Sequence, residues 1–372
     1  MMAAHPQPSP TLLLGPGPSN VPDSVLATLA RPMVGHLDPR FLAIMESCKE
    51  RLRLAMRTGN AVTFPVSGTG SAGMEAVLVN VLQAGDAVVV GVNGVFGTRI
   101  ANLVDRMGGK AVRVAAPWGR AIAIDDLAAA ARAARPRVIA VVHGETSTGV
   151  RQPMAGLGEL AREIDALLLV DCVTSLGGVP VELDAWGVDL AYSGTQKCLN
   201  CPPGLSPVSF SERALERFRA RTTPVPSFYF DIGEILKYLG SGTTGRTYHH
   251  TAPVGMVTAL DAALGLMLDE GLEARWRRHA DAQEHLISKL ADLGLTPFVP
   301  AAERLAPLTT IRIPDGIDEV RVRRRLIEER GIELGAGLGP MAGRVWRIGL
   351  MGVNAQRQVV DRFVEALAWA MS

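Results

Sequence analysis

Between residues 61 and 210 the chain alternates short apolar runs with longer amphipathic segments. Apolar runs of this kind are typical of parallel strands that are buried on both faces. The predicted strands are 87–92 (AVVVGV), 138–143 (VIAVVH), 166–171 (ALLLVD) and 188–194 (VDLAYSG). The predicted helices among them are 71–82, 98–107, 124–134 and 156–164. This alternation predicts an α/β fold with a large, doubly wound, mostly parallel sheet and helices on both of its faces.

The pattern changes after residue 255. Residues 256–294 read as a long amphipathic helix that is broken at Gly271 and ends at Gly294. Shorter strand and helix patterns follow at 308–314, 320–330, 345–352 and 355–371. A chain of 372 residues is long enough for two domains. We expect an N-terminal arm at 1–20, a large α/β domain at 21–265 and a small C-terminal α+β domain at 266–372.

Charge and hydropathy exclude several classes of function. The chain has 38 basic and 37 acidic residues and a net charge of +1, so its charge favours neither nucleic acid nor an anionic membrane. No apolar run approaches the roughly 18–20 residues that span a bilayer. The first ten residues lack the basic and apolar regions of a secretory signal. We therefore expect no nucleic-acid partner, no membrane association and a cytoplasmic location.

Gly68, Gly70 and Gly73, in VSGTGSAG, have the G-x-G-x-x-G spacing of a dinucleotide-binding motif. Such a site also needs an acidic residue at the end of the next strand, where it binds the ribose. The next strand ends in VNG without a carboxylate, and Asp86 precedes that strand. The stretch therefore predicts a phosphate site at a helix N-terminus, where backbone N–H groups converge. A tight turn without a ligand is the alternative interpretation.

Cys198 and Cys201 form a C-x-x-C pair in CLNC. A structural zinc site would need a second pair of ligands, and none has suitable spacing. A thioredoxin-like motif would begin a helix early in a small domain, whereas this pair precedes PPG. We interpret these cysteines as small side chains that fill space.

Lys197 and Asp171 each follow an apolar strand. Burial at such a place lowers the pKa of a lysine and makes its amine a nucleophile for a Schiff base; a surface lysine is the plainer interpretation. A carboxylate that closes an all-apolar strand needs a cationic or hydrogen-bonded partner, and the protonated nitrogen of a pyridine ring is one. A phosphate turn, a carboxylate and a lysine at the carboxyl ends of strands together predict a pyridoxal 5′-phosphate site.

The chain resembles the class V, fold-type I aminotransferases of the alanine–glyoxylate and serine–glyoxylate group. The resemblance extends from LLLGPGPSNVP at 12–22 to RIGLMG at 347–352. The matching motifs between these ends are VSGTGS, NGVFGTR, HGETSTGV, LLLVDCVTSLGG, AWGVDLAYSGTQK, YHHTAP and GLGPMAGRVWRIGLMG. The resemblance implies a pyridoxal phosphate-dependent transaminase of the fold-type I architecture.

The resemblance also implies the roles of individual residues. Lys197 would bind the cofactor and then move a proton, and Asp171 would keep the pyridine nitrogen protonated. The other cofactor-binding residues would be Thr69, Gly70, Ser71 and Gln196 at the phosphate, Thr146 at the phenolic oxygen, and Phe96 and Val173 on the two ring faces. Some relatives carry histidine or tryptophan in place of Ser71, so the preferred amino donor stays open.

Tyr248 and Thr251 in YHHTAP match phosphate ligands that come from a neighbouring subunit, which implies a homodimer with shared active sites. His249 and His250 lie between them. Neighbouring side chains on an extended segment point apart, so we expect no metal site at this pair or elsewhere.

Arg347 matches the arginine that binds the substrate α-carboxylate in a bidentate pair. Gly17 and His36 are expected near the substrate. The implied reaction transfers the amino group of alanine or serine to glyoxylate, giving glycine and pyruvate or hydroxypyruvate. The alternatives within the family are ureidoglycine–glyoxylate, pyridoxamine–pyruvate and aminoethylphosphonate–pyruvate transamination. A dinucleotide-dependent dehydrogenase is the alternative from another class, and it leaves Lys197 without a role.

Overall fold

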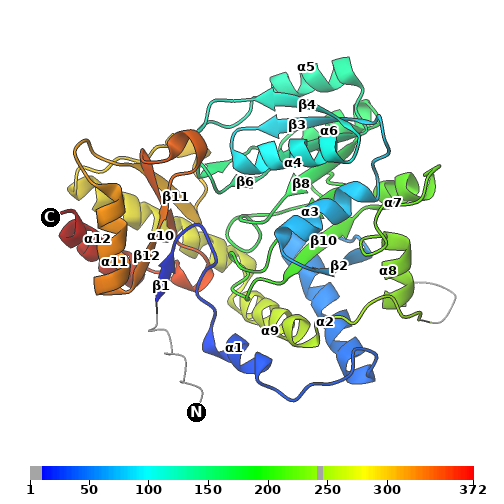
Figure 1. Cartoon of the computed structure of the whole chain (residues 1–372), viewed down its shortest axis with the longest axis horizontal. Coiled ribbons are helices and arrows are strands. Elements are labelled where there is room, and N and C mark those ends of the chain that lie inside the picture. Colours follow the sequence, from blue (N-terminus) through cyan, green and yellow to red (C-terminus); the bar gives the residue numbers. More distant parts are fainter. Residues whose placement is uncertain (1–10, 241–245) are drawn as a thin grey trace, which may run out of the picture.

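The computed structural model describes residues 11–240 and 246–372. The first half of the predicted arm, 1–10, therefore lies outside the described residues. The described chain forms a larger and a smaller sheet, each packed with its own helices (Figure 1). Among the described helices, none is long and apolar enough to cross a membrane.

The larger sheet has the strand order β2-β10-β9-β8-β5-β3-β4. All its neighbouring strands are parallel except β10, which runs antiparallel to β2 and to β9. The strands are β2 (Val62–Ser67), β3 (Ala87–Val92), β4 (Lys110–Ala115), β5 (Val138–Val142), β8 (Leu167–Asp171), β9 (Leu190–Tyr192) and β10 (Leu205–Phe210). The four predicted strands end within two residues of β3, β5, β8 and β9. The doubly wound, mostly parallel sheet is confirmed.

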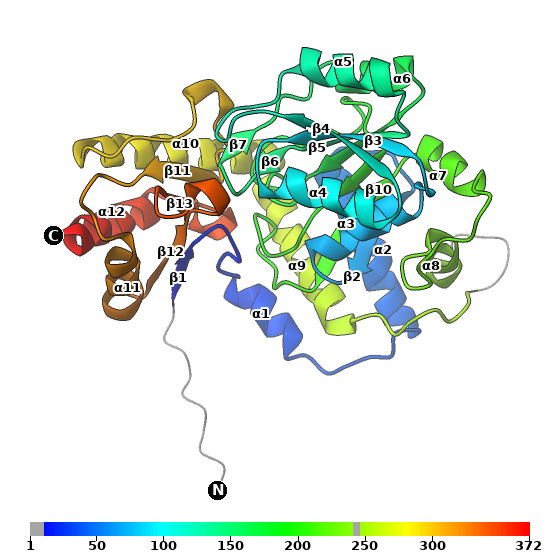
Figure 2. The same cartoon turned by 45° about the horizontal axis from the view of Figure 1, so that its top comes forward.

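Helices cover both faces of this sheet, with α3 and α4 on one face and α5 and α6 on the other (Figure 2). The helices of this part are α1 (Asp23–Leu29), α2 (Pro39–Met56), α3 (Gly70–Val79), α4 (Val95–Arg106), α5 (Ile124–Ala134), α6 (Leu157–Glu163), α7 (Glu212–Arg219), α8 (Ile232–Leu239) and α9 (Val254–Glu270). The middle strands are fully buried, which explains their unbroken apolar sequences.

The predicted helix at 98–107 begins three residues earlier in the structure, at Val95. The added turn contains Phe96. Side chains from the short hairpin of β6 (Gly144–Glu145) and β7 (Val150–Arg151) bind the first backbone N–H groups of α4. A helix start that depends on a partner about fifty residues away leaves no signal in the local sequence.

The smaller sheet has the order β1-β12-β13-β11. Its strands are β1 (Leu12–Leu14), β11 (Leu308–Arg312), β12 (Ile332–Ala336) and β13 (Val345–Gly349). It shares a core with α10 (Leu272–Asp292), α11 (Glu319–Arg330) and α12 (Arg357–Met371). As predicted, the long helical segment is interrupted at Gly271, which has a φ of +83°. β1 belongs to the predicted arm, yet it pairs in parallel with β12.

Gly73 sets the distance between α3 and the larger sheet. A Cβ atom at this position would lie 1.9 Å from the Ser206 Oγ and 3.2 Å from the Tyr192 Cβ. The third glycine of the G-x-G-x-x-G stretch therefore allows a helix to pack closely on β9 and β10. This packing role explains the glycine without a dinucleotide.

We expect Gly73→Ala to lower the free energy of unfolding by about 1–3 kcal/mol, because the added methyl group overpacks this contact. Urea unfolding followed by circular dichroism measures the change. Gly255→Ala in α9 is the matched control, since its Cβ would meet only Leu29, at 3.8 Å. The control should be neutral or gain up to about 1 kcal/mol from helix propensity. Equal effects of the two variants would contradict the packing argument.

Candidate active site

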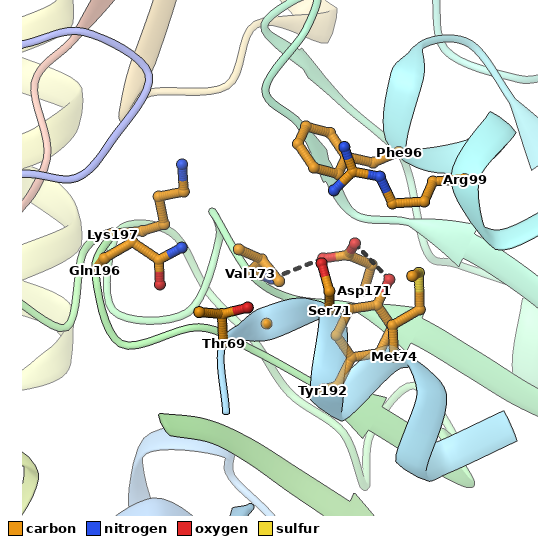
Figure 3. A pocket seen from close by; sticks show the side chains of 11 residues that line it. Thr69, Ser71, Met74, Phe96, Arg99, Asp171, Val173, Tyr192, Gln196 and Lys197 are labelled. Carbon is orange, nitrogen blue, oxygen red and sulfur yellow. Dashed lines mark hydrogen bonds between the residues drawn. The ribbon is translucent and has the colours of Figure 1, made fainter. Parts of the chain in front are cut away.

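A cavity of about 190 Å³ lies where β8 and β9 end and α3 begins. Eight of the predicted site residues line it: Thr69, Gly70, Ser71, Phe96, Asp171, Val173, Gln196 and Lys197 (Figure 3). Met74, Arg99 and Tyr192 also line it, although none of them is among the predicted site residues. Tyr192 and Arg99 stand inside two of the matching motifs, AYSGTQK and NGVFGTR, so the motifs held a signal for both.

The first turn of α3 forms one wall of the cavity. Within the described chain no side chain caps this helix, whose N-cap residue is Thr69. Its first N–H groups are therefore available to an anion, and the helix dipole favours negative charge there. A Cβ at Gly70 would lie 3.2 Å from the Val173 side chain, so the glycine lets the turn approach that residue closely. The geometry suits the predicted phosphate.

Gln196 faces this turn from the opposite loop (Figure 3). Its Oε1 atom is buried and has no hydrogen-bond partner among the described residues. A phosphate accepts hydrogen bonds, so it would be bound by the NH₂ group of this amide and by the uncapped N–H groups of α3, while the amide oxygen needs a separate donor.

Asp171 is the last residue of β8 and is only 2% exposed. Its Oδ1 accepts a hydrogen bond of 2.8 Å from the Val173 N–H, and its Oδ2 accepts one of 2.6 Å from the Tyr192 hydroxyl. Burial raises the pKa of this carboxyl to about 6, against the lowering effect of the two donors. A protonated pyridine nitrogen would give the buried carboxylate a cationic partner.

Lys197 follows β9 and is 8% exposed. Burial lowers the pKa of its amine to about 8. Its Nζ donates a hydrogen bond to the Pro16 carbonyl. Gly17 adjoins the amine so closely that a Cβ there would lie 2.5 Å from the Nζ, and its φ of +106° also favours glycine. The segment after β1 therefore touches the lysine.

The loop that carries Lys197 is held by the segment after β1 and by α10. The Ser19 N–H and hydroxyl donate to the carbonyls of Gln196 and Lys197. Arg275 of α10 donates to the Cys198 carbonyl and to Asn200. Asn200, with a φ of +52°, bonds back to Ser19. These bonds fix the position of the lysine backbone.

Cys198 and Cys201 are buried in this loop as free thiols. Burial raises the pKa of both thiols to about 12, so they are protonated near neutral pH and lack the thiolate needed for redox chemistry. This agrees with the interpretation of the pair as packing residues.

Arg347 reaches the site from β13 of the smaller sheet. Its Nε donates to the Ala336 carbonyl at 2.7 Å, and one terminal nitrogen donates to the Thr146 carbonyl at 3.1 Å. Its charge contributes to the lowered pKa of Lys197, so the two cations lie in each other's field. The structure thus brings Arg347 and Thr146 together beside the cavity. Neither residue lines the cavity itself.

Tyr248, Thr251 and His36 lie apart from the cavity of their own chain. Tyr248 is 68% exposed, and its hydroxyl lies 3.4 Å from the Thr251 hydroxyl. The His36 ring packs edge-on against Tyr248, with ring centres 5.6 Å apart. These three residues form a group outside the cavity lining.

The expectation that His249 and His250 point apart was wrong. Their Nδ1 atoms lie 2.8 Å from each other, because the segment is not a strand and does not alternate its side chains. Burial and the neighbouring histidines lower the pKa of His250 to about 4. Among the described residues no three His, Cys, Asp or Glu side chains gather as a metal site.

The depressed pKa of Lys197 gives a test on the cofactor-free protein. An amine reacts only when neutral, so Lys197 should be labelled with a midpoint near pH 8. Lys237 is an internal control, because its ion pair with Glu234 raises its pKa and shifts its labelling to higher pH. Peptide mass spectrometry after brief labelling across pH 6–11 measures both profiles. Coinciding midpoints would contradict the burial argument.

The family model described as Aminotransferase class-V matches residues 12–363. An alanine–glyoxylate aminotransferase of Callithrix jacchus is 42% identical over 361 residues, which cover 97% of this chain and 87% of the relative. The crystal structure of an alanine–glyoxylate aminotransferase from Nostoc sp. matches with a TM-score of 0.97 and 48% identity, covering 100% of this chain and 98% of that one.

A ureidoglycine–glyoxylate aminotransferase from Bacillus subtilis has a crystal structure that matches with a TM-score of 0.95 and 35% identity. The match covers 99% of this chain and 94% of that chain. The sequence resemblance, the mostly parallel sheet and the converging lysine, carboxylate and helix N-terminus agree with these comparisons. The chain belongs to the class V aminotransferases, and it is a fold-type I transaminase that uses pyridoxal phosphate.

Proposed function

We propose that this transaminase moves the amino group of a small L-amino acid, alanine or serine, to glyoxylate. The products are glycine and either pyruvate or hydroxypyruvate. The proposal rests on one observation: Lys197, Asp171 and the first turn of α3 line the same cavity, in a chain that is similar to alanine–glyoxylate aminotransferases.

Pyridoxal phosphate supplies an electron sink that stabilises negative charge at the substrate Cα. Thr69, Gly70, Ser71 and Gln196 would hold its phosphate, and Asp171 would pair with its ring nitrogen. Thr146 would bind its phenolic oxygen. Val173 and Phe96 would contact the two ring faces.

Lys197 performs the proton transfer. Because burial keeps its pKa near 8, a useful fraction of the amine is neutral at physiological pH and can take the proton from the substrate Cα. The hydrogen bond to the Pro16 carbonyl and the close contact with Gly17 restrict the position of the Nζ. Restricting this atom aligns the base with the carbon that it deprotonates.

Arg347 would bind the substrate carboxylate. Its Nε is held by Ala336 and one terminal nitrogen by Thr146, which orients the planar guanidinium. A bidentate pair with a carboxylate then fixes the plane of the substrate. Gly17, next to the lysine, would line the same space.

We further propose that the active enzyme is a cytoplasmic homodimer in which Tyr248 and Thr251 enter the site of the second copy. Both residues are exposed and neither lines the cavity of its own chain, which supports this arrangement. His36 packs on Tyr248 and would accompany it to the partner's site. Two copies related by a twofold axis would complete each other's sites equally.

Ureidoglycine is the alternative donor, because a ureidoglycine–glyoxylate aminotransferase matches nearly the whole chain. Ser71 lies in the cavity wall next to the phosphate turn and leaves more room than a histidine or tryptophan would. Transamination of pyridoxamine with pyruvate requires a site without a phosphate anchor, and the uncapped α3 with Gln196 argues against it.

Half-reaction spectra test the substrates. The holoenzyme should show the violet absorbance of a lysine-bound cofactor, lose it with the true donor, and regain it when glyoxylate is added. Alanine, serine and ureidoglycine are compared as donors, with pyruvate as the competing acceptor. Lys197→Ala should lack the absorbance. If glyoxylate fails to restore it after every donor, the assignment of the acceptor is wrong.

Hybrid dimers test the shared site. Lys197→Ala and Tyr248→Ala should each be nearly inactive alone. After the two variants are mixed, unfolded and refolded together, half of the dimers combine one chain of each kind. The Tyr248→Ala chain keeps its lysine and receives an intact Tyr248, so about a quarter of the sites should recover. No recovery in hybrid dimers would place Tyr248 outside the partner's site.

A further inference from the structure

Helix α4 lacks a capping side chain of its own, because its N-cap residue is Gly94. The hairpin of β6 and β7 supplies the cap instead. The Val95 N–H donates to the Ser147 hydroxyl at 3.0 Å. The N–H groups of Phe96 and Gly97 donate to the Glu145 Oε2 at 3.0 and 3.3 Å. Three of the four N–H groups that a helix start leaves without a partner are thus satisfied from another element.

Glu145 is fully buried, and its other carboxylate oxygen is also occupied. Its Oε1 accepts hydrogen bonds from the Ser147 N–H at 3.1 Å and from the Ser147 hydroxyl at 2.5 Å. Gly94 makes room for this group, since a Cβ there would lie 2.4 Å from both the Glu145 Cδ and the Ser147 Oγ. Burying a carboxylate costs free energy. Four donors on one buried carboxylate therefore indicate that the structure requires Glu145 at this position.

The two capping residues stand on either side of Thr146. Phe96, whose N–H is capped, lies in the first turn of α4 and lines the cavity. The Thr146 carbonyl is held by Arg347. One carboxylate therefore connects the helix turn that carries Phe96 to the strand end that carries Thr146.

We propose that Glu145 and Ser147 are positioning residues, which hold Phe96 and Thr146 at a fixed separation so that both contact the cofactor ring. The inference rests on the proposed roles of these two residues. An anionic acceptor suits this place because the helix dipole favours negative charge at the start of α4. Without it the first turn of α4 would fray, and Phe96 would lose its defined position over the ring.

Glu145→Gln tests the proposal with a side chain of the same shape. The glutamine side chain has no charge, and its NH₂ group must face either the N–H groups of α4 or the donors of Ser147, where it cannot accept a hydrogen bond. The substitution therefore weakens the cap without leaving a cavity. We expect the dissociation constant for pyridoxal phosphate to rise about tenfold, the cost of one lost charge-assisted bond. The visible circular dichroism of the bound cofactor should weaken, and kcat should fall more than KM rises. Ser147→Ala should change each quantity in the same direction by less.

Asp318→Ala is the matched control for a purely structural role. Asp318 caps α11 of the smaller sheet by accepting from the Arg321 N–H at 3.0 Å. Its loss should lower the unfolding temperature and leave cofactor affinity and dichroism unchanged. If Glu145→Gln lowers the unfolding temperature but likewise leaves both cofactor readouts unchanged, the positioning role is refuted. If Glu145→Gln does not fold, Ser147→Ala decides by the same two readouts.

Phe96→Leu separates this inference from the proposed site. It should weaken the dichroism and the cofactor affinity directly, while the capping bonds, which involve only the backbone N–H, persist. Unchanged cofactor readouts in Phe96→Leu would overturn the proposed role of Phe96. A changed Phe96→Leu beside an unchanged Glu145→Gln would overturn the capping inference alone.

Discussion

The site depends on the removal of two ionisable side chains from water. Lys197 and Asp171 are each less than a tenth exposed. Burial lowers the pKa of the lysine and raises the pKa of the carboxyl, and both shifts favour the neutral form. The lysine becomes a competent base near neutral pH, and the carboxylate becomes a strong partner for a cation. Both changes have the same cause, which is the loss of hydration at the carboxyl edge of an apolar sheet. The packing of the apolar sheet therefore produces both the hydrophobic core and the shifted pKa values of Lys197 and Asp171.

That edge is closed only because the two sheets meet there. The Pro16 carbonyl and Gly17 arrive from the segment after β1, and Arg347 arrives from β13, so the smaller sheet covers the amine of a loop in the larger one. Close approaches at the junction support this packing: a Cβ at Gly352, just after β13, would lie 1.7 Å from the Oδ1 of Asn200 in the loop that carries Lys197. The roles that we propose for Arg347 in substrate binding and for Lys197 in proton transfer thus both depend on the docking of two cores.

Sequence patterns predicted the strands of the larger sheet and the break at Gly271 because both follow from local physics. Continuous apolar runs form buried strands, and glycine tolerates a positive φ. The same reasoning failed for the histidine pair, since a period of two applies only to regular strands, and for the start of α4, whose cap is distant in sequence. It also missed Tyr192, whose hydroxyl meets Asp171 only after two neighbouring strands have paired.

The sequence by itself determined the class of the protein, the identity of the lysine and carboxylate, and the absence of a ribose-binding acid after the glycine motif. These features depend on residue type and spacing along the chain. Only the tertiary structure decided which surfaces enclose them, that Glu145 caps a helix fifty residues away, and that Tyr248 is exposed and does not line the cavity of its own chain. The physical reason is that desolvation and hydrogen-bond partnership are properties of neighbours in space, and they arise when distant segments pack together.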